Sequence, residues 1–327
     1  MPKSSPSPKR RGRLLRRGAA FVVLLAVTGY LAVQYVTGGP GAPGCAVVSD
    51  DGAGAGARYE FTPEQAVNAA TIAAVGTGRG LPERAVTIAL ATSLQESGLR
   101  NITHGDRDSL GLFQQRPSQG WGTEREILDP IYSAGIFYEH LVKVRGYTEL
   151  PLTVAAQRVQ RSGYPEAYAK HEPDATLLAA ALTGRSAATL TCEGVPGGPS
   201  AGGADSVRAA LVRDFGQDAL QSAADEVGSA KATPTPTPSV IESDGQTVVL
   251  PVTPGKGSGA GRSVRERGWQ LAHWAVANAS DLHIQRVSYA GREWTAGNTD
   301  SQWRAIVGQG ASGAGGGLDS VRIVMTH

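Results

Sequence analysis

The chain has 327 residues, 43 of them glycine and 19 proline, and a formal net charge of +2. This length is enough for two modest domains, and the glycine and proline content indicates that much of it is linker. Seven basic residues and no acid lie in residues 1–17, so the rest of the chain carries a net negative charge. This distribution excludes the basic surface typical of nucleic-acid-binding proteins, and we expect no nucleic acid among the partners.

Residues 18–36 follow the basic tail and contain no charged side chain. At ~1.5 Å per residue, a helix of this length nearly matches a hydrocarbon core of ~30 Å, and the preceding Lys and Arg residues favour a cytoplasmic N-terminus. The alternative is a cleaved signal peptide, whose apolar region usually has roughly 7–15 residues. We predict a transmembrane helix over 18–36, a linker over 37–60, and a cell-membrane protein whose remaining chain is extracellular.

The chain has two cysteines, Cys45 and Cys192. Outside the cell an even number of cysteines permits a disulfide bond. Because the two residues flank one helical segment, a bridge between them would join the two ends of that segment. The alternative is two unrelated free thiols, and we predict the disulfide.

Two helices are predicted at the start of this segment. Thr62 and Gln65 form a capping-box pattern with Pro63 at the first helical position, and an Ala-rich helix follows. A second helix starts after Gly80 and stops at Gly98. Residues that recur at intervals of three or four positions lie on one face of a helix. In this second helix that face consists of Leu81, Ala85, Ile88, Ala89, Thr92 and Glu96.

Glu96 lies at the end of this core-facing stripe. Burial disfavours the ionised form of a carboxyl group, and an acid that stays protonated near neutral pH can donate a proton to a leaving oxygen. Glu96 is therefore the candidate catalytic residue. The alternative is an ordinary carboxylate at a helix end.

Polar and aromatic side chains that suit a sugar follow Glu96 in the chain. Hydroxyl and amide groups bond the polar groups of a sugar, and aromatic rings have flat apolar surfaces on which a sugar can stack. The candidates for substrate binding are Ser97, Gln114, Gln115, Trp121 and Tyr138.

The next helix is predicted to begin at Pro130 with Asp129 as its N-cap, after a loop over 101–116. The shorter helical segments that follow are residues 152–160, 164–170 and 175–183. These elements complete a mainly α domain over residues 61–192.

The rest of the chain is predicted to be a linker and a second domain. The Gly/Pro/Thr-rich linker over 193–262 contains a helical segment at 205–227 and an extended Pro/Thr stretch at 232–240. A small α+β domain over 263–327 follows, with a helix at 263–279 and then strands. The expected strands are RVSYAG (286–291), REWTAG (292–297) and DSVRIVMT (319–326).

Three motifs occur in order within residues 61–192. They are Glu96-Ser97, then Ser109 with Gly111-Leu112-Phe113-Gln114, and then Asp129-Pro130 through Gly135 to Tyr138. Together they resemble the lysozyme-like superfamily, most closely its soluble lytic transglycosylase branch and the actinobacterial relatives of that branch. The resemblance implies a mainly α lysozyme-like domain with a cleft across Glu96.

The same resemblance implies that Glu96 protonates the glycosidic oxygen between N-acetylmuramic acid and N-acetylglucosamine in peptidoglycan, without a cofactor. In a lytic transglycosylase this residue then acts as the base, and the muramic C6 hydroxyl closes on C1 to give a 1,6-anhydro product. A hydrolase would need a second carboxylate, for which Asp106, Asp108 and Glu124 are available. We favour the single-acid mechanism because Asp106 and Asp108, in a Gly-containing turn, are expected to bond their own backbone.

One segment departs from the family pattern. The family's AAYNAG segment is AAQRVQ here, residues 155–160, and Gln157 replaces the tyrosine that usually contacts the catalytic glutamate. Tyr164 or Tyr168 is available to take that place. The altered segment keeps an alternative function open, a non-catalytic wall-binding protein that uses the cleft for recognition.

Residues 268–298 resemble the small C-terminal domain of secreted actinobacterial proteins related to zinc D,D-carboxypeptidases. Ser320 and Arg322 replace the two zinc-binding histidines of the D-H-V-H strand in that group. Arginine does not ligate zinc and a lone serine is a poor ligand, so we expect no metal site. The residues expected to be surface or packing histidines are His273, His283 and His327, and the aromatic residues expected mostly in the core are Trp269, Trp274, Tyr289, Trp294 and Trp303. This domain is interpreted as a wall-binding or partner-binding module.

The leading interpretation is a membrane-anchored enzyme that cleaves the glycan strands of peptidoglycan in the cell wall. Its expected architecture is an N-terminal transmembrane helix, a mainly α lysozyme-like domain and a small α+β C-terminal domain.

Overall fold

The computed structural model describes residues 44–50, 56–162, 164–194, 203–216, 241–242, 245–252, 263–297, 302–306 and 317–325. The chain divides into two compact units, residues 1–42 and 43–327, and the described residues all belong to the second. The predicted tail and transmembrane helix lie outside the described residues, as do the Pro/Thr stretch and His327. Among the helices that the structure describes, none has the length and apolar character needed to span a bilayer.

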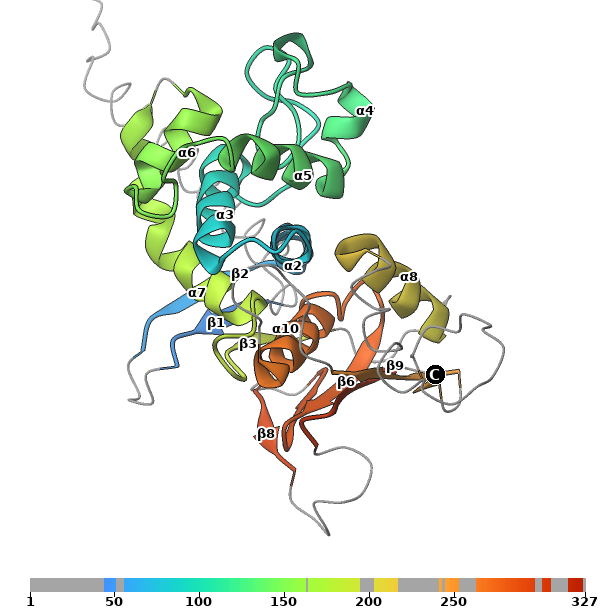
Figure 1. The fold of residues 1–327 in the computed structure, drawn as a ribbon. Coiled ribbons are helices and arrows are strands. Elements are labelled where there is room, and N and C mark those ends of the chain that lie inside the picture. The colour runs from blue at the N-terminus through green and yellow to red at the C-terminus, as the bar shows by residue number, and fades with distance from the viewer. Residues whose placement is uncertain are drawn as a thin grey trace, which may run out of the picture. The chain divides into compact units, whose positions relative to one another are not determined.

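The helical part begins with α2 (Pro63–Gly78) and α3 (Glu83–Ser97), which pack against each other (Figure 1). The capping box of α2 is formed, since the Thr62 hydroxyl accepts a hydrogen bond from the backbone of Gln65 and the Gln65 side chain bonds the backbone of Thr62. The end of α3 is also as predicted. Gly98 adopts a left-handed conformation there (φ 63°), which glycine enters without steric cost.

The chain from α3 to α5 (Pro130–Leu141) is mostly loop. It contains two short elements that the sequence did not predict, η1 (Pro117–Gln119) and α4 (Glu124–Ile127). The predicted N-cap of α5 is confirmed, because Asp129 accepts a hydrogen bond from the backbone of Ile131 at 2.9 Å.

The helical part continues with α6 (Leu152–Gln160), η2 (Pro165–His171) and α7 (Glu172–Leu182). The predicted bounds of α6 are confirmed. The predicted helix at 164–170 is instead a 3₁₀ helix shifted by one residue, and α7 starts three residues before its predicted position. Proline is favoured in the first turn of a helix, and Pro173 in the first turn of α7 accounts for the early start.

A three-stranded antiparallel sheet of order β2-β1-β3 connects the two ends of the helical part. Its strands are β1 (Cys45–Val48), β2 (Arg58–Phe61) and β3 (Leu190–Cys192). Cys45 pairs with Cys192 in the sheet, and the two form the predicted disulfide. The prediction of a linker over 37–60 is wrong for β1 and β2. Strands of four residues carry little local signal, and these two form by pairing with each other and, for β1, with β3 far along the chain.

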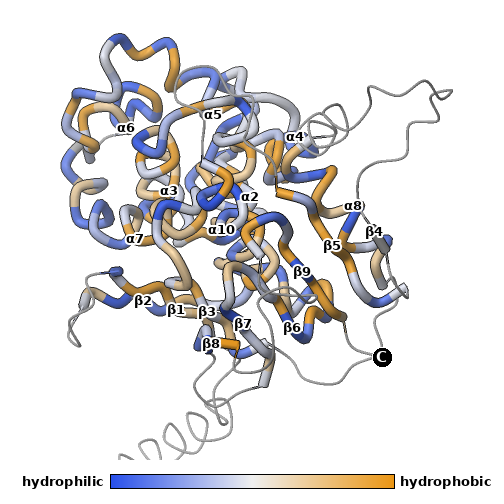
Figure 2. The backbone as a smooth tube through the Cα atoms, turned by 60° about the horizontal axis from the view of Figure 1, so that its bottom comes forward, coloured by the Kyte–Doolittle hydropathy of each residue, from blue (hydrophilic) through white to orange (hydrophobic). Residues whose placement is uncertain are grey.

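The described residues of the C-terminal half form two helices and a second sheet. The helix α8 (Gly203–Phe215) covers part of the helical segment predicted at 205–227, and α10 (Val264–Ala277) matches the helix predicted at 263–279. The six-stranded antiparallel sheet has the order β4-β5-β9-β6-β7-β8. Its strands are β4 (Ile241–Glu242), β5 (Thr247–Pro251), β6 (Ile284–Tyr289), β7 (Arg292–Thr295), β8 (Arg304–Ala305) and β9 (Ser320–Met325). Hydrophobic residues are frequent along β5, β6 and β9 (Figure 2).

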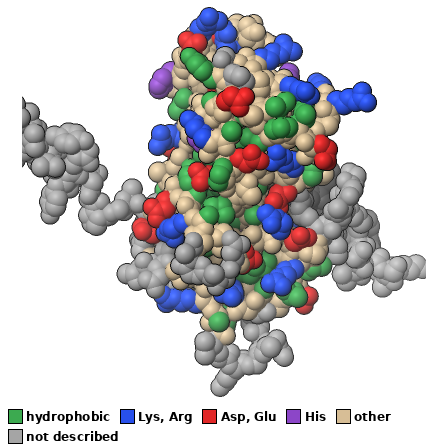
Figure 3. Space-filling view, turned by 90° about the vertical axis from the view of Figure 1, so that its left-hand side faces the viewer, with side chains coloured by type: hydrophobic (Ala, Val, Ile, Leu, Met, Phe, Trp, Pro, Cys, Tyr) green, Lys and Arg blue, Asp and Glu red, His purple; other side chains and the backbone are tan. Residues whose placement is uncertain are grey.

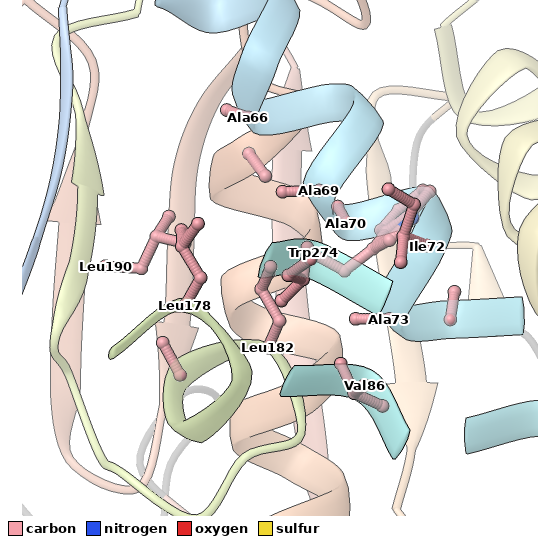
Figure 4. Packing of buried hydrophobic residues seen from close by; sticks show 14 of the residues in the cluster. Ala66, Ala69, Ala70, Ile72, Ala73, Val86, Leu178, Leu182, Leu190 and Trp274 are labelled. Carbon is pink, nitrogen blue, oxygen red and sulfur yellow. The ribbon is translucent and has the colours of Figure 1, made fainter. Parts of the chain in front are cut away.

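The described part of the protein is therefore about half helical with a separate small β-sheet region, and the two share one buried core. Figure 4 shows where they meet, and the labelled residues are Ala66, Ala69, Ala70, Ile72 and Ala73 of α2, Val86 of α3, Leu178 and Leu182 of α7, Leu190 of β3 and Trp274 of α10. The small side chains of α2 let its neighbours approach closely. Buried contacts thus cross the predicted boundaries between residues 61–192, 193–262 and 263–327.

Candidate active site around Glu96

Glu96 is the penultimate residue of α3, whose preceding turns are buried in the core. The side chain itself is half-buried. The left-handed Gly98 donates its N–H to the carbonyls of Leu94 and Ser93 and turns the chain away immediately after the acid. The carboxyl group is thus held on a rigid element at the edge of the core.

One side chain from another part of the chain bonds the Glu96 carboxylate. The hydroxyl of the buried Tyr168, on η2, donates to Oε1 at 2.7 Å, while the amide of Gln160 at the end of α6 donates to the carbonyl of Phe113 at 2.8 Å. Burial is the largest influence and raises the pKa of Glu96, while the Tyr168 bond and the polar side chain of Gln160 lower it and only partly offset the burial. The net effect keeps the acid protonated at a higher pH than an ordinary glutamate.

A tyrosine thus bonds Glu96 in this structure, but it is Tyr168 on η2 and not a residue at position 157. The amide of Gln157 instead donates to the carbonyl of Ser162 at 2.6 Å. Tyr164, the other candidate for this place, is 80% exposed. In the sequence Tyr164 and Tyr168 are equivalent candidates, and no local pattern singles out Gln160.

Ser97 fastens the GLFQ loop to α3. Its hydroxyl donates to the carbonyl of Leu112 at 2.8 Å, alongside Ser93 at 3.0 Å, and accepts from the backbone of Arg100 at 3.2 Å. The Ser97 hydroxyl, predicted to bind substrate, is therefore engaged within the protein and positions the loop next to Glu96.

Of the two glutamines predicted to bind substrate, only Gln114 has a side chain that is partly accessible to a ligand. Gln114 is half-buried, has a left-handed backbone (φ 48°), and bonds the carbonyl of Gly111 through its amide at 3.3 Å. Gln115 is buried, and its amide donates to the carbonyl of Ser133 on α5 at 3.0 Å. Gln115 therefore fixes the loop onto α5, and its side chain is not available to a ligand in this structure.

The two aromatic candidates have different environments. Trp121 is half-buried and stacks on His140, with ring centroids 4.3 Å apart. Tyr138 lies fully in the core, where its hydroxyl donates to the carbonyl of Ile72 at 3.0 Å. The prediction that Tyr138 stacks on a sugar is therefore wrong for this structure, because its ring has no exposed face.

The carboxylates considered for a second catalytic role lie in the loop and in α4. Asp108 bonds Arg116 at 2.6 Å and the backbone of Ser118 at 2.8 Å, and these bonds hold its pKa well below the usual range. Asp108 thus shapes the loop, as predicted, while Asp106 and Glu124 are exposed. In the described part of the chain, no charged side chain is among the causes that shift the pKa of Glu96.

The histidine at the centre of α10 is a packing residue, as predicted. His273 is fully buried, and its Nε2 accepts from the backbone of Thr189 at 3.3 Å, so its Nδ1 carries the proton and donates to the carbonyl of Ala181 at 2.8 Å. Burial lowers its pKa to about 4. Among the described residues, no group of three or more His, Cys, Asp or Glu side chains is arranged to hold a metal ion.

Comparisons of the sequence with protein-family models and with curated proteins find no match. The chemistry of this site is therefore judged from its own residues. They bring together a half-buried acid, a tyrosine that donates a hydrogen bond to it, and a loop that is fastened to the same helix.

Proposed function

We propose that this protein is a peptidoglycan-cleaving enzyme of the lytic transglycosylase type, anchored in the cell membrane by residues 18–36 and facing the cell wall. The observation that carries the proposal is the half-buried Glu96 whose carboxylate is held by Tyr168. A carboxyl group with a raised pKa on a rigid element is suited to general acid catalysis near neutral pH.

In the proposed reaction, Glu96 gives its proton to the oxygen that joins C1 of N-acetylmuramic acid to C4 of N-acetylglucosamine. The C1–O bond breaks, and the N-acetylglucosamine side leaves with a new hydroxyl. The Glu96 carboxylate then takes the proton of the muramic C6 hydroxyl while that oxygen bonds to C1. The product is a 1,6-anhydro sugar, no water is consumed, and Glu96 ends protonated.

An inverting or a retaining hydrolase needs a second carboxylate close to the first, at roughly 5–10 Å. Of the three carboxylates considered for this role, Asp108 is committed to Arg116 and Ser118, and this supports the single-acid mechanism, while Asp106 and Glu124 are exposed.

The proposal predicts that Glu96→Gln abolishes cleavage of purified peptidoglycan. Glutamine has nearly the same shape but cannot donate the catalytic proton, and losing a general acid and base typically lowers the rate about 10²–10⁴-fold. Soluble products of the wild-type protein are separated and identified by mass spectrometry, and we expect anhydro-muropeptides, which are one water lighter than hydrolysis products.

Glu60→Gln is the matched control, because it removes an exposed carboxylate on β2 that is not a catalytic candidate, and it is expected to leave cleavage unchanged. Reducing ends without anhydro products would replace the transglycosylase mechanism with hydrolysis. A wild-type protein that binds peptidoglycan but releases nothing would support the alternative of a non-catalytic wall-binding protein.

A further inference from the structure

The hydroxyl that bonds Glu96 comes from η2, a 3₁₀ helix of seven residues. The hydrogen bonds of a 3₁₀ helix have poorer geometry than those of an α-helix, and runs longer than about four residues are uncommon. Contacts with the rest of the molecule are therefore needed to hold η2 in place. Tyr168 reaches Glu96 only while these contacts keep η2 against α3, with which it packs.

The start of η2 is fastened to α6 by the side chain of Gln157. Its amide donates to the carbonyl of Ser162 at 2.6 Å. The Ser162 hydroxyl accepts a hydrogen bond from the backbone N–H of Tyr164 at 3.2 Å, and the carbonyl of Tyr164 accepts one from the backbone N–H of Ala167 at 3.1 Å. A series of hydrogen bonds thus leads from Gln157 to the residue directly before Tyr168.

The backbone of Gln157 also fixes the direction in which the chain leaves α6. Arg161, which ends α6, has a left-handed conformation (φ 53°), and its N–H donates to the carbonyl of Gln157 at 2.8 Å. A residue with a side chain keeps this conformation only where the surrounding contacts determine it. Gln157 supplies two such contacts, because its carbonyl holds Arg161 and its amide holds Ser162.

The far end of η2 is held by separate contacts. Nε2 of His171 lies 3.2 Å from Oε1 of Gln95, the residue before Glu96, and the side chain of Tyr168 is buried. These contacts stay in place when the Gln157 amide is removed. We therefore expect its loss to shift the start of η2 without releasing the whole helix from α3.

The oxygen of the Gln157 amide is a second, independent observation. Oε1 is buried, and among the described residues it has no hydrogen-bond partner. A buried amide oxygen without a donor lowers the stability of the folded state. An apolar side chain of similar length would therefore cost little stability at this position, although it could not hold the carbonyl of Ser162. The contribution of the glutamine is thus the path of the chain rather than stability.

We propose that Gln157 is a positioning residue of the active site, which fixes the start of η2 so that the Tyr168 hydroxyl meets the Glu96 carboxylate. The inference rests on the proposed function, in which Glu96 is the acid and the base. It adds to that function a residue that acts on the acid only through Tyr168. Gln157 takes no part in proton transfer, since its amide is bonded to the carbonyl of Ser162.

The test is Gln157→Met, which keeps the length of the side chain and removes the amide. The ionisation of Glu96 is followed by NMR of the full chain in detergent micelles with isotope-labelled glutamate carboxyls, and the Glu96 signal is the one that is missing in Glu96→Gln. We expect the titration midpoint of Glu96 to move to higher pH, by no more than in Tyr168→Phe, because a displaced hydroxyl stabilises the carboxylate less. The urea midpoint is expected to stay close to that of the wild type.

The double variant Gln157→Met with Tyr168→Phe shows whether Gln157 acts through the tyrosine. Substitutions that remove the same contact do not add, so we expect the double variant to titrate like Tyr168→Phe alone. Two shifts that add would overturn the inference, because Gln157 would then influence Glu96 by another route.

Arg158→Gln is the matched control, because Arg158 is the next residue of α6 and is exposed. Several Lys and Arg side chains are exposed at the upper end of the side that carries α6 (Figure 3), and we expect the loss of one such charge to leave the Glu96 titration unchanged. A Gln157→Met protein that titrates like this control would overturn the inference.

A large fall in the urea midpoint of Gln157→Met would also overturn the inference, because Gln157 would then be a structural residue. These titrations do not depend on catalysis. A wild-type protein that releases nothing from peptidoglycan would contradict the proposed function and leave the titration of Glu96 as a valid test of Gln157. The two failures are therefore distinguishable.

Discussion

At the scale of single residues, the behaviour of Glu96 is decided by two opposing influences on its pKa. Burial at the end of α3 raises the pKa, and the hydrogen bond from Tyr168, together with the polar side chain of Gln160, lowers it. Both influences suit an acid that first gives a proton and then accepts one. Burial keeps the acid protonated before the first step, and hydrogen bonding stabilises the carboxylate that forms after it. Tyr168 is therefore a positioning residue for the proposed reaction.

We predict that Tyr168→Phe raises the pKa of Glu96. The variant removes only the hydroxyl that bonds the carboxylate, and a hydrogen bond to a charged group contributes about 1.5–3 kcal/mol, against 1.36 kcal/mol for each pKa unit. Allowing for the partial exposure of Glu96, a rise of about one unit is expected. Because the acid then stays protonated up to a higher pH, the alkaline limb of the kcat/KM profile shifts to higher pH.

The measurement is the pH dependence of peptidoglycan cleavage in the wild type and the variant. Tyr164→Phe serves as the control, since the hydroxyl of this exposed tyrosine does not bond Glu96. An alkaline limb that stays at the same pH or shifts to lower pH in Tyr168→Phe would show that the Tyr168 bond does not lower the pKa of Glu96.

At the scale of elements, α8 is fastened to the core through one buried carboxylate. Asp214 accepts hydrogen bonds from the indole of Trp274 on α10 at 2.8 Å and from the hydroxyl of Thr71 on α2 at 3.4 Å, and it pairs with Arg213 at 2.8 Å. A single side chain of the predicted linker thus connects α2 with α10.

We predict that Asp214→Ala lowers the free energy of unfolding by about 2–4 kcal/mol. The substitution leaves the buried indole N–H of Trp274 and the hydroxyl of Thr71 without their acceptor, and each unsatisfied buried group costs about 1–3 kcal/mol. Urea denaturation followed by circular dichroism measures the change. Asp205→Ala removes an exposed carboxylate from the same helix and should change stability by no more than about 0.5 kcal/mol. Equal effects of the two variants would contradict the anchoring role.

The helices were better predicted than the strands, and the reason is their local signals. Thr62 with Gln65, Gly98, and Asp129 with Pro130 mark helix ends within a few residues, so α2, α3 and α5 follow from the sequence. The strands β1 and β3 become a sheet only through a partner 147 residues away at the disulfide, which no local pattern reveals. The segment at 164–170 has helical spacing, and its 3₁₀ geometry was not visible in that spacing.

At the scale of the whole molecule, the disulfide between Cys45 and Cys192 closes a loop with a sequence separation of 147 residues. The bond joins the first strand of the described chain to the end of the helical part. By the chain-entropy argument, a cross-link over so long a loop stabilises the folded state by about 4–5 kcal/mol, and measured values for native disulfides are about 2–5 kcal/mol.

We predict that reduction lowers the urea midpoint of the wild-type protein by an amount consistent with a loss of about 2–5 kcal/mol. The double variant Cys45→Ser with Cys192→Ser is the control, since it should already have the lower midpoint and should not respond to reductant. A wild-type protein whose thiols react with an alkylating reagent before reduction would contradict the disulfide.

The sequence by itself determined where α2 begins, where α3 ends and where α5 begins, the two cysteines, and the acid at the end of an apolar stripe, because each depends on neighbouring residues or on composition. Tertiary structure alone decided that Tyr168, 72 residues further along, bonds Glu96, that Tyr138 is buried rather than exposed, and that Ser97 holds a loop. It also placed α8 and α10 on the same core as α2. These are contacts between distant segments, and their energies come from burial and hydrogen bonding that exist only after the chain has folded.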